Sequence, residues 1–318
     1  MDPVPQVIVE DRASVSVARE RVRAVAAGAG FVPADVERLA IVVSELAQNQ
    51  LDHARDGRIE VRAIARDGVG GVEIEAVDLG PGIRAVEQVL AGRPPEPGGL
   101  GIGLGAVRRL VEELDVDVRL GEGTAVVARR FTRPVARLPE IVVLGRGVET
   151  PSGDQARVVR DAAGLLAAVV DGVGHGPEAR EVALRAIDEV RPGRGPLEVL
   201  AAMHEVLHRT RGAAATVVRW EPGAVQVAGV GNVACRVIPP AGASHHASPT
   251  AGLLGAHRRT TPRLHRLPMA LLDVLVLFTD GISHRVEPVV AGRSTVSVAA
   301  ELLGGAKPHD DALVLVAR

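Results

Sequence analysis

An apolar run that ends in an aspartate and a glycine is the feature that most constrains this chain. Residues 274–278 read Val-Leu-Val-Leu-Phe, and Thr279-Asp280-Gly281 follow at once. A run of β-forming residues bounded by a glycine turn predicts a buried strand that presents the aspartate at its end. The same arrangement occurs where the apolar residues 165–170 run into Asp171-Gly172. We therefore expect two strands that each deliver a carboxylate to the edge of a sheet.

Two further acidic turns lie in the same half of the chain. Asp154 follows Ser152-Gly153, and Asp310-Asp311 precede the last apolar run, residues 312–316. Carboxylates that converge at strand ends repel one another and lose hydration, and a divalent cation removes that cost. Hard oxygen ligands suit Mg²⁺ or Mn²⁺. A single Asp-Gly after a strand is usually only a turn, but four such sites in one half of the chain favour a metal site.

These turns resemble those of the PPM-type (type-2C) serine/threonine phosphatases, in the bacterial branch that includes the SpoIIE and RsbX phosphatases. The resemblance covers about residues 140 to 318 and implies an α-β-β-α sandwich with two Mn²⁺ or Mg²⁺ ions. Asp171 would be the catalytic residue that bridges both ions, which activate a water for attack on phosphorus. The residues that the resemblance assigns to the metals are Asp154, Asp171, Gly172, Asp280 and one of Asp310 and Asp311, with Asp310 favoured.

One position departs from the pattern of this phosphatase family. Eukaryotic relatives place a histidine directly after the first Asp-Gly, where it is a candidate general acid. Here Val173 occupies that position, and His175 lies two residues further along the chain. For His175, a turn-stabilising role and a role as proton donor are both open.

The first half of the chain predicts a different series of elements. Hydrophobic periodicity, helix-start signals and glycine turns define them. The expected strands span residues 4–9, 58–65, 72–78, 115–120 and 124–131, and the expected helices span residues 14–27, 33–54 and 106–113. Residues 132–139 contain two prolines and two arginines and predict a linker.

Three polar clusters mark this half. Glu45, Asn49 and His53 are four residues apart and therefore share one helix face. Asp78 ends a predicted strand and begins the turn Asp78-Leu79-Gly80-Pro81-Gly82. The glycine-rich residues 98–105 run into a helix, where backbone N–H groups can approach phosphates. Alone, the first cluster could be a solvated helix face, and the third could be a flexible loop without a Walker lysine.

In this order the clusters resemble the GHKL (Bergerat-fold) ATP-binding family, in the branch of the RsbW/RsbT-type anti-sigma-factor serine kinases. The resemblance covers about residues 5 to 132 and implies an α/β two-layer sandwich that binds ATP with Mg²⁺. Asp78 would accept from the adenine amino group, Asn49 would hold Mg²⁺ on the triphosphate, and Glu45 would be the kinase base. The residues that it assigns to the nucleotide are Asn49, His53, Asp78, Gly80, Gly82, Gly99, Gly101, Gly103, Leu104 and Thr124.

Together the two resemblances predict a bifunctional chain. We expect an ATP-binding, serine-kinase-like domain over residues 1–133, a linker over 134–139 and a metal-dependent phosphatase domain over 140–318. The expected partner is a STAS-domain anti-sigma-factor antagonist or stressosome phosphoprotein, with a sigma factor as a second partner. In an alternative interpretation, the first domain is a non-catalytic ATP-binding module that only docks such a protein. The presence of Glu45 argues for catalysis, because a scaffold needs no base.

Composition excludes several other classes of function. The formal charge is −2, and the chain has three Phe, one Trp and no Tyr. It therefore offers neither a basic surface nor the aromatic platforms on which nucleic-acid bases stack. The single cysteine, Cys235, excludes an internal disulfide and predicts a small core residue. Charges or glycines interrupt every apolar run well short of a membrane span, so we expect a cytoplasmic protein.

Overall fold

The computed structural model describes residues 6–92, 103–148, 150–161, 164–257 and 260–318. Its contacts divide the chain into two compact units, Met1–Glu140 and Ile141–Arg318. Both units mix helices and strands, as the sequence predicts. Among the described residues, no helix has both the length and the apolarity that a bilayer crossing requires.

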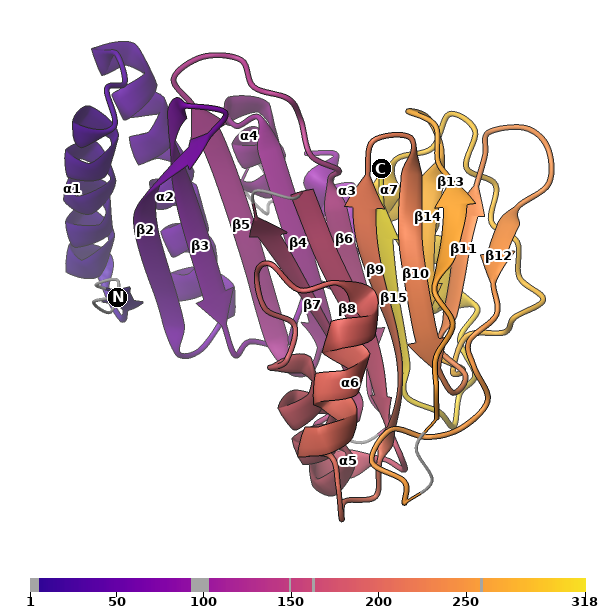
Figure 1. Ribbon diagram of the computed structural model, residues 1–318. Helices are drawn as coiled ribbons and strands as arrows, with labels where there is room; N and C mark the ends of the chain where they lie inside the picture. The colour runs from indigo at the N-terminus through magenta and orange to yellow at the C-terminus, as the bar shows by residue number, and fades with distance from the viewer. Residues whose placement is uncertain (1–5, 93–102, 149, 162–163, 258–259) are drawn as a thin grey trace. The chain divides into compact units, whose positions relative to one another are not determined.

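The first unit is one antiparallel sheet with its helices on one face (Figure 1). The strands lie in the order β1-β2-β3-β5-β4. Leu39, Val43 and Leu46 on α2 are fully or almost fully buried, as are Ile59 and Ile74 on the sheet. In chain order the elements are β1 (Gln6–Val9), α1 (Arg12–Gly28), α2 (Pro33–His53), β2 (Gly57–Arg66), β3 (Val69–Asp78), α3 (Val86–Leu90), α4 (Gly103–Leu110), β4 (Glu113–Leu120) and β5 (Gly123–Phe131).

Local signals set both long helices. Asp11 caps α1, because its side chain accepts the backbone N–H of Ser14 at 2.8 Å. Pro33 stands in the first turn of α2, where the missing N–H costs nothing. The end of α4 differs from the prediction: the helix ends at Leu110, and Glu113 begins β4. The reason is tertiary, since the buried Glu113 carboxylate pairs with Arg66 across the sheet.

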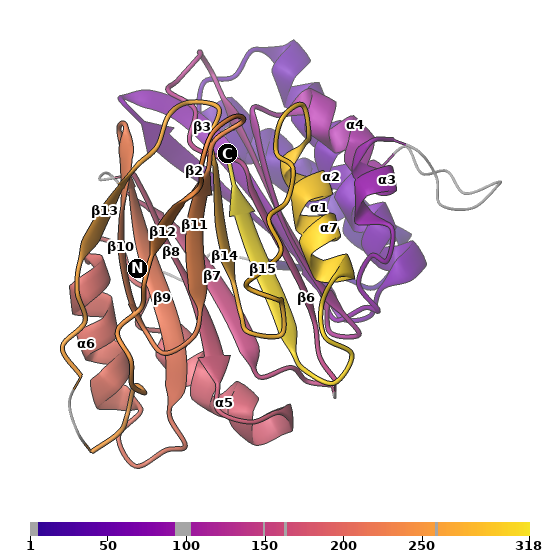
Figure 2. The same ribbon diagram turned by 90° about the vertical axis from the view of Figure 1, so that its right-hand side faces the viewer.

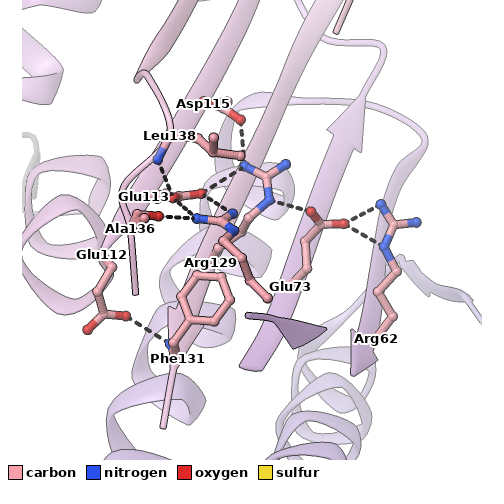
Figure 3. Close-up of polar contacts among 10 residues, drawn as sticks. Arg62, Glu73, Glu112, Glu113, Asp115, Arg129, Phe131, Ala136 and Leu138 are labelled. Carbon is pink, nitrogen blue, oxygen red and sulfur yellow. Dashed lines mark hydrogen bonds and ion pairs between the residues drawn. The ribbon is translucent and has the colours of Figure 1, made fainter. Parts of the chain in front are cut away.

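The sheet face opposite the helices carries a cluster of paired charges (Figure 3). Arg129 lies at its centre and donates to Glu73 at 2.5 Å and to Asp115 at 2.6 Å. Glu73 also accepts from Arg62, and the side chains of Arg129 and Glu73 are only 8% and 7% exposed. Burying a single charge would cost too much desolvation free energy, but ion pairs such as these can be buried.

The charge cluster also holds the segment that follows β5. Arg66 donates to the carbonyl of Ala136 at 3.1 Å, and Glu113 accepts the N–H of Leu138 at 3.1 Å (Figure 3). The N–H of Thr132 donates to Gly70 at 2.9 Å. The predicted linker is thus hydrogen-bonded to the first unit at Thr132, Ala136 and Leu138.

The second unit is an α-β-β-α sandwich of two five-stranded sheets (Figure 2). One sheet has the order β6-β15-β14-β11-β12 and carries α7 (Thr295–Gly304); the other has the order β13-β10-β9-β8-β7 and carries α5 (Gly176–Ile187) and α6 (Pro196–Val206). The strands of the first sheet are β6 (Ile141–Arg146), β15 (Ala312–Ala317), β14 (Val274–Phe278), β11 (Ala234–Ile238) and β12 (His245–Ala247). Those of the second are β13 (His265–Pro268), β10 (Ala224–Val230), β9 (Ala213–Glu221), β8 (Gly164–Gly172) and β7 (Asp154–Asp161).

Burial on both faces explains why β8, β14 and β15 read as continuous apolar runs. In β8, Leu165 and Val169 point into the core between the sheets, whereas Leu166 and Val170 point toward α5 and α6. Cys235 lies in the core between the sheets, 2% exposed, and burial raises the pKa of its thiol to about 12. The predicted role of a small core residue is confirmed.

Candidate functional site

A cavity of about 480 Å³ opens in the second unit where several strands end or begin. The residues that line it include Asp171 at the end of β8, Asp280 two residues after β14, and Asp310-Asp311 directly before β15. The alternation of buried strands and tight turns therefore brings together four carboxylates from three distant parts of the sequence.

The carboxylates in this cavity oppose one another's ionisation. Burial, followed by repulsion from Asp280 and Asp310, raises the pKa of Asp171 to about 7. Burial and the charge of Asp280 also raise the pKa of Asp310, while the Lys307 ammonium at 3.6 Å acts in the opposite direction. Such a cluster gains most from a bound cation, whose charge removes the repulsion.

Asp310 and Asp311 have different surroundings. The side chain of Asp310 is 42% exposed and faces the cavity. Asp311 is buried, and its two oxygens accept the backbone N–H groups of Val148 at 2.8 Å and Gly153 at 2.6 Å. Of the two residues, Asp310 is thus the one with oxygens open to a ligand.

Asp154 and Gly172 are not among the residues that line the cavity. Asp154 is opposite Asp171 in the register of β7 and β8 and is 2% exposed. Its Oδ2 accepts the hydroxyl of Thr279 at 2.7 Å, and Thr279 Oγ1 in turn accepts the N–H of Leu313. Gly172 is buried beside Gly153, whose carbonyl accepts its N–H at 3.2 Å.

The donor set fits hard divalent cations. It consists of carboxylate oxygens, the chemistry that Mg²⁺ and Mn²⁺ prefer. Among the described residues, no three His, Cys, Asp or Glu side chains converge on a single point that could hold one ion.

Two neighbours of this cavity are absent from the sequence prediction. Asn232, after β10, donates to Asp280 Oδ2 at 2.6 Å and so orients that carboxylate. His309 lines the cavity beside Asp310. The contact of Asn232 spans 48 positions and leaves no local signal. His175 also lines the cavity and is the N-cap of α5, a position compatible with both of its predicted roles.

The first unit brings the predicted nucleotide residues of α2 against the start of α4. Glu45 and Asn49 are half-buried on α2, and His53 is its exposed last residue. A Cβ at Gly103 would lie 2.8 Å from Asn49 Oδ1, so the close approach requires glycine. Gly103 and Leu104 are buried at the start of α4, whereas Gly99 and Gly101 lie outside the described residues.

Asp78 forms a second corner of the same unit. Its Oδ1 accepts the N–H of Gly80 at 2.8 Å and of Thr124, its register partner on β5, at 3.2 Å. Burial raises the pKa of Asp78, and these two N–H groups partly offset the effect. Gly82 has φ +72° and lies against the Arg119 carbonyl. The structure thus places Asp78, Gly80 and Thr124 together.

Gln50 supports this corner and is also absent from the sequence prediction. Its side chain is 5% exposed, and its Nε2 donates to the carbonyls of Arg58 and Val77 at 3.1 Å each. These carbonyls belong to register partners on β2 and β3, next to Asp78. Gln50 therefore ties α2 to the strand end that carries Asp78.

Comparison with known proteins assigns a family to each unit. The family of histidine kinase-, DNA gyrase B- and HSP90-like ATPases matches residues 34–134, and the family of stage II sporulation protein E (SpoIIE) matches residues 161–295. The serine/threonine-protein kinase RsbT of Bacillus subtilis (strain 168) is 37% identical over 119 residues, which cover 37% of this chain and 90% of that kinase.

Two solved structures are similar over more than half of the chain. One, described as "The bacterial stressosome: a modular system that has been adapted to control secondary messenger signaling", is 29% identical with a TM-score of 0.53, covering 57% of this chain and all of that one. The other, RsbX in complex with magnesium, is 21% identical with a TM-score of 0.52, and the match covers 58% of this chain and 96% of the RsbX chain. At that identity, the RsbX likeness shows the fold alone.

The matches agree with the geometry of both units, and the predicted recognition is confirmed. The chain belongs, through its first unit, to the GHKL ATPase family that includes the RsbT serine/threonine kinase, and it joins this kinase-like domain to a SpoIIE-type PPM serine phosphatase domain.

Proposed function

We propose that this chain sets the phosphorylation state of a partner-switching protein through two opposed activities. The first unit would transfer a phosphoryl group from ATP to a serine or threonine, and the second would remove it by hydrolysis. The observation that carries the proposal is the presence in one chain of both a GHKL nucleotide corner with Glu45 and a four-carboxylate cavity.

In the kinase-like unit, each residue would have a separate task. Asp78 would accept from the adenine amino group, because it presents a carboxylate already fixed by two backbone N–H groups. Asn49 would hold Mg²⁺ on the triphosphate, and Gly103 beside it would let the chain approach the phosphates. Glu45, one helical turn before Asn49, would accept the proton of the substrate hydroxyl.

In the phosphatase unit, Asp171, Asp280 and Asp310 would hold two divalent cations, Mg²⁺ or Mn²⁺. Asp154 and Gly172 would complete the site, since Asp154 is the register partner of Asp171 and Gly172 follows Asp171 directly. When bound, such ions hold phosphoryl oxygens and supply a nucleophilic hydroxide. Asn232 would keep Asp280 in place, and Asp311 would fix the backbone at Val148 and Gly153.

The substrate we propose is a STAS-domain protein, either an anti-sigma-factor antagonist or a stressosome component. The likeness to RsbT and to the stressosome structure supports this choice of partner. A sigma factor is the second partner that we propose. The first unit would bind it after the STAS protein has been phosphorylated and has dissociated from that unit. The reactions would take place in the cytoplasm, where ATP and these partners meet.

The test uses full-length protein, labelled ATP, Mn²⁺ and purified STAS proteins as candidate substrates. Asp171→Asn should accumulate label on the substrate, Glu45→Ala should leave it unlabelled, and the unsubstituted chain should label it and then release the label. If Asp171→Asn binds ATP but labels no STAS protein, the first unit is a docking module and only the phosphatase acts. Label that the unsubstituted chain never removes would refute a shared substrate.

A further inference from the structure

The described lining of the cavity is strongly acidic. It contains four aspartates and two histidines but neither lysine nor arginine. A phosphoserine monoester brings a phosphoryl group with close to two negative charges. Even with cations bound, such a site gains affinity and selectivity from a fixed positive group beside the phosphoryl oxygens.

Arg211 is a guanidinium held beside this cavity. The next residue, Gly212, accepts the N–H of Val173 at 3.1 Å through its carbonyl, and Ala213 continues as the register partner of Gly172. The N–H of Gly212 also donates to the hydroxyl of Thr210 at 3.1 Å. The backbone at Arg211 is therefore tied to the turn that follows Asp171.

The side chain of Arg211 reaches the cavity wall at Gly174. Its Nη1 lies 3.4 Å from where a Cβ of residue 174 would be, and Gly174 itself lines the cavity. Gly174 has φ +95°, a conformation that favours glycine. With no side chain at this position, little separates the guanidinium from the cavity.

The present partner of Arg211 is easily replaced. Arg211 pairs with Glu178 in the first turn of α5, and the two side chains are 53% and 71% exposed. An ion pair this exposed contributes little to stability, so breaking it costs little. Lys307, another cation near the cavity, is instead paired with Asp310.

We propose that Arg211 is the phosphoryl-recognition residue of the phosphatase unit, and this inference rests on the phosphatase function proposed above. On substrate binding, its guanidinium leaves the Glu178 carboxylate and donates to two non-bridging oxygens of the phosphoserine. The planar guanidinium matches a phosphoryl group with two parallel N–H···O bonds, which a lysine cannot provide. Glu178 acts as a competitor that occupies Arg211 until a phosphoryl group arrives.

Opposite effects of two substitutions distinguish this role from a structural ion pair. Arg211→Ala in the full-length, Mn²⁺-loaded protein should raise the KM for a phosphoserine peptide about 10- to 100-fold, with a smaller change in kcat. Arg211→Lys should restore part of the affinity. Glu178→Gln should lower KM, because it removes the competitor. If the pair were only structural, both substitutions would act in the same direction.

A matched control ion pair lies on α5, the helix that carries Glu178. Arg185 pairs with Glu181 on α5, with side chains 54% and 64% exposed, and neither residue lines the cavity. Arg185→Ala should leave KM and kcat unchanged. Inorganic phosphate binding to the metal-loaded protein, measured by calorimetry, gives a readout without turnover: Arg211→Ala should weaken it and Glu178→Gln should strengthen it.

These measurements separate the two levels of the proposal. Hydrolysis by the unsubstituted chain, with KM and phosphate affinity unchanged in Arg211→Ala, would overturn the role of Arg211 and leave the phosphatase function intact. Arg211-dependent phosphate binding without hydrolysis of any phosphoester would overturn the phosphatase function and keep the recognition site. If the protein showed no phosphate binding and no hydrolysis, both the role of Arg211 and the phosphatase function would be overturned.

Discussion

Asp311 accepts the backbone N–H of Gly153 at 2.6 Å, although 158 positions separate the two residues. Its other oxygen accepts the N–H of Val148. This contact holds the turn before Asp154 against the start of β15. Asp310, one residue earlier, also lines the cavity but has a more exposed side chain. We therefore expect the adjacent aspartates to serve different purposes, one for the backbone and one for a ligand.

The first prediction separates these purposes. In Asp311→Asn an amide NH₂ must face one of two backbone N–H donors, so the free energy of unfolding should fall by about 1–3 kcal/mol. Asp310→Asn should keep its stability but lose metal affinity and phosphatase turnover. Denaturant unfolding in chelator and hydrolysis of p-nitrophenyl phosphate with Mn²⁺ measure the two effects. A loss of stability in Asp310→Asn and a loss of turnover in Asp311→Asn would show that the two residues have the opposite roles.

A second prediction tests the metal site itself. Asp171→Asn and Asp280→Asn should each abolish metal-dependent hydrolysis while ATP binding persists, because each removes anionic charge from the cavity and leaves the first unit untouched. Asp188→Asn, at an exposed aspartate that pairs with Arg157, is the matched control and should hydrolyse normally. Undiminished hydrolysis in Asp171→Asn would disprove the assignment.

The third prediction concerns pH in the metal-free protein. The folded chain holds a proton on Asp171 up to about pH 7, whereas the unfolded chain releases it near the ordinary value of 3.8. The folded state therefore binds more protons in this window, and its stability falls as pH rises from about 4 to 7. The side-chain amide that Asp171→Asn introduces does not titrate. The stability of this variant should therefore not fall over this pH range for that reason.

With chelator present, Asp171→Asn should thus gain about 1–3 kcal/mol of unfolding free energy over the parent between pH 5 and pH 8. Denaturant titrations at both pH values measure it, with Asp188→Asn as control. A stability difference that is the same at both pH values would contradict the raised pKa.

The strands that deliver aspartates to the cavity were predictable from sequence, for a physical reason. A strand buried on both faces has no polar side, so β8, β14 and β15 stand out as apolar runs, and the aspartates at their ends follow. Arg211 and Asn232 could not be found this way, because their positions near the cavity depend on loops packed by distant contacts. Asp154 was predicted in an acidic turn, but its position at the start of β7 and its hydrogen bond with the Thr279 hydroxyl depend on the register between strands.

In the first unit, periodicity predicted every long helix and strand, but some boundaries were wrong: β3 begins at Val69 and not at residue 72, and α4 spans Gly103–Leu110 and not residues 106–113. A helix through Glu113 satisfies the local pattern, whereas pairing with Arg66 draws that residue into β4. Local propensity is a weak prior beside such a buried contact. The support that Gln50 gives to Asp78 was equally invisible, since a buried glutamine has no sequence signature.

The fourth prediction separates nucleotide binding from phosphoryl transfer. Asp78→Asn should weaken ATP binding, because its amide can present a donor where the adenine amino group needs an acceptor. Glu45→Ala should bind ATP nearly as well as the parent and lose about 10²–10⁴-fold in transfer rate. Equilibrium ATP binding and a single-turnover transfer assay measure the two. Transfer at the parent rate by Glu45→Ala would show that Glu45 is not the base.

The fifth prediction concerns where the chain can be divided. Fragments 1–140 and 138–318 should each fold, the first binding ATP with Mg²⁺ and the second hydrolysing phosphoester with Mn²⁺. Fragment 1–135 should unfold about 1–3 kcal/mol more easily than 1–140, because it lacks the Ala136 carbonyl and the Leu138 N–H that Arg66 and Glu113 bind. Equal stability of fragments 1–135 and 1–140, or a folded but inactive 138–318, would contradict this boundary.

The buried thiol of Cys235 has a practical consequence. A maleimide dye reacts with exposed thiolate, and a core cysteine whose pKa is near 12 offers almost none. The native cysteine can therefore stay in place while new cysteines are introduced at exposed positions such as Arg38 in the first unit and Arg185 in the second. A donor and acceptor pair at these positions would report by energy transfer whether ATP or Mn²⁺ changes the distance between the two units.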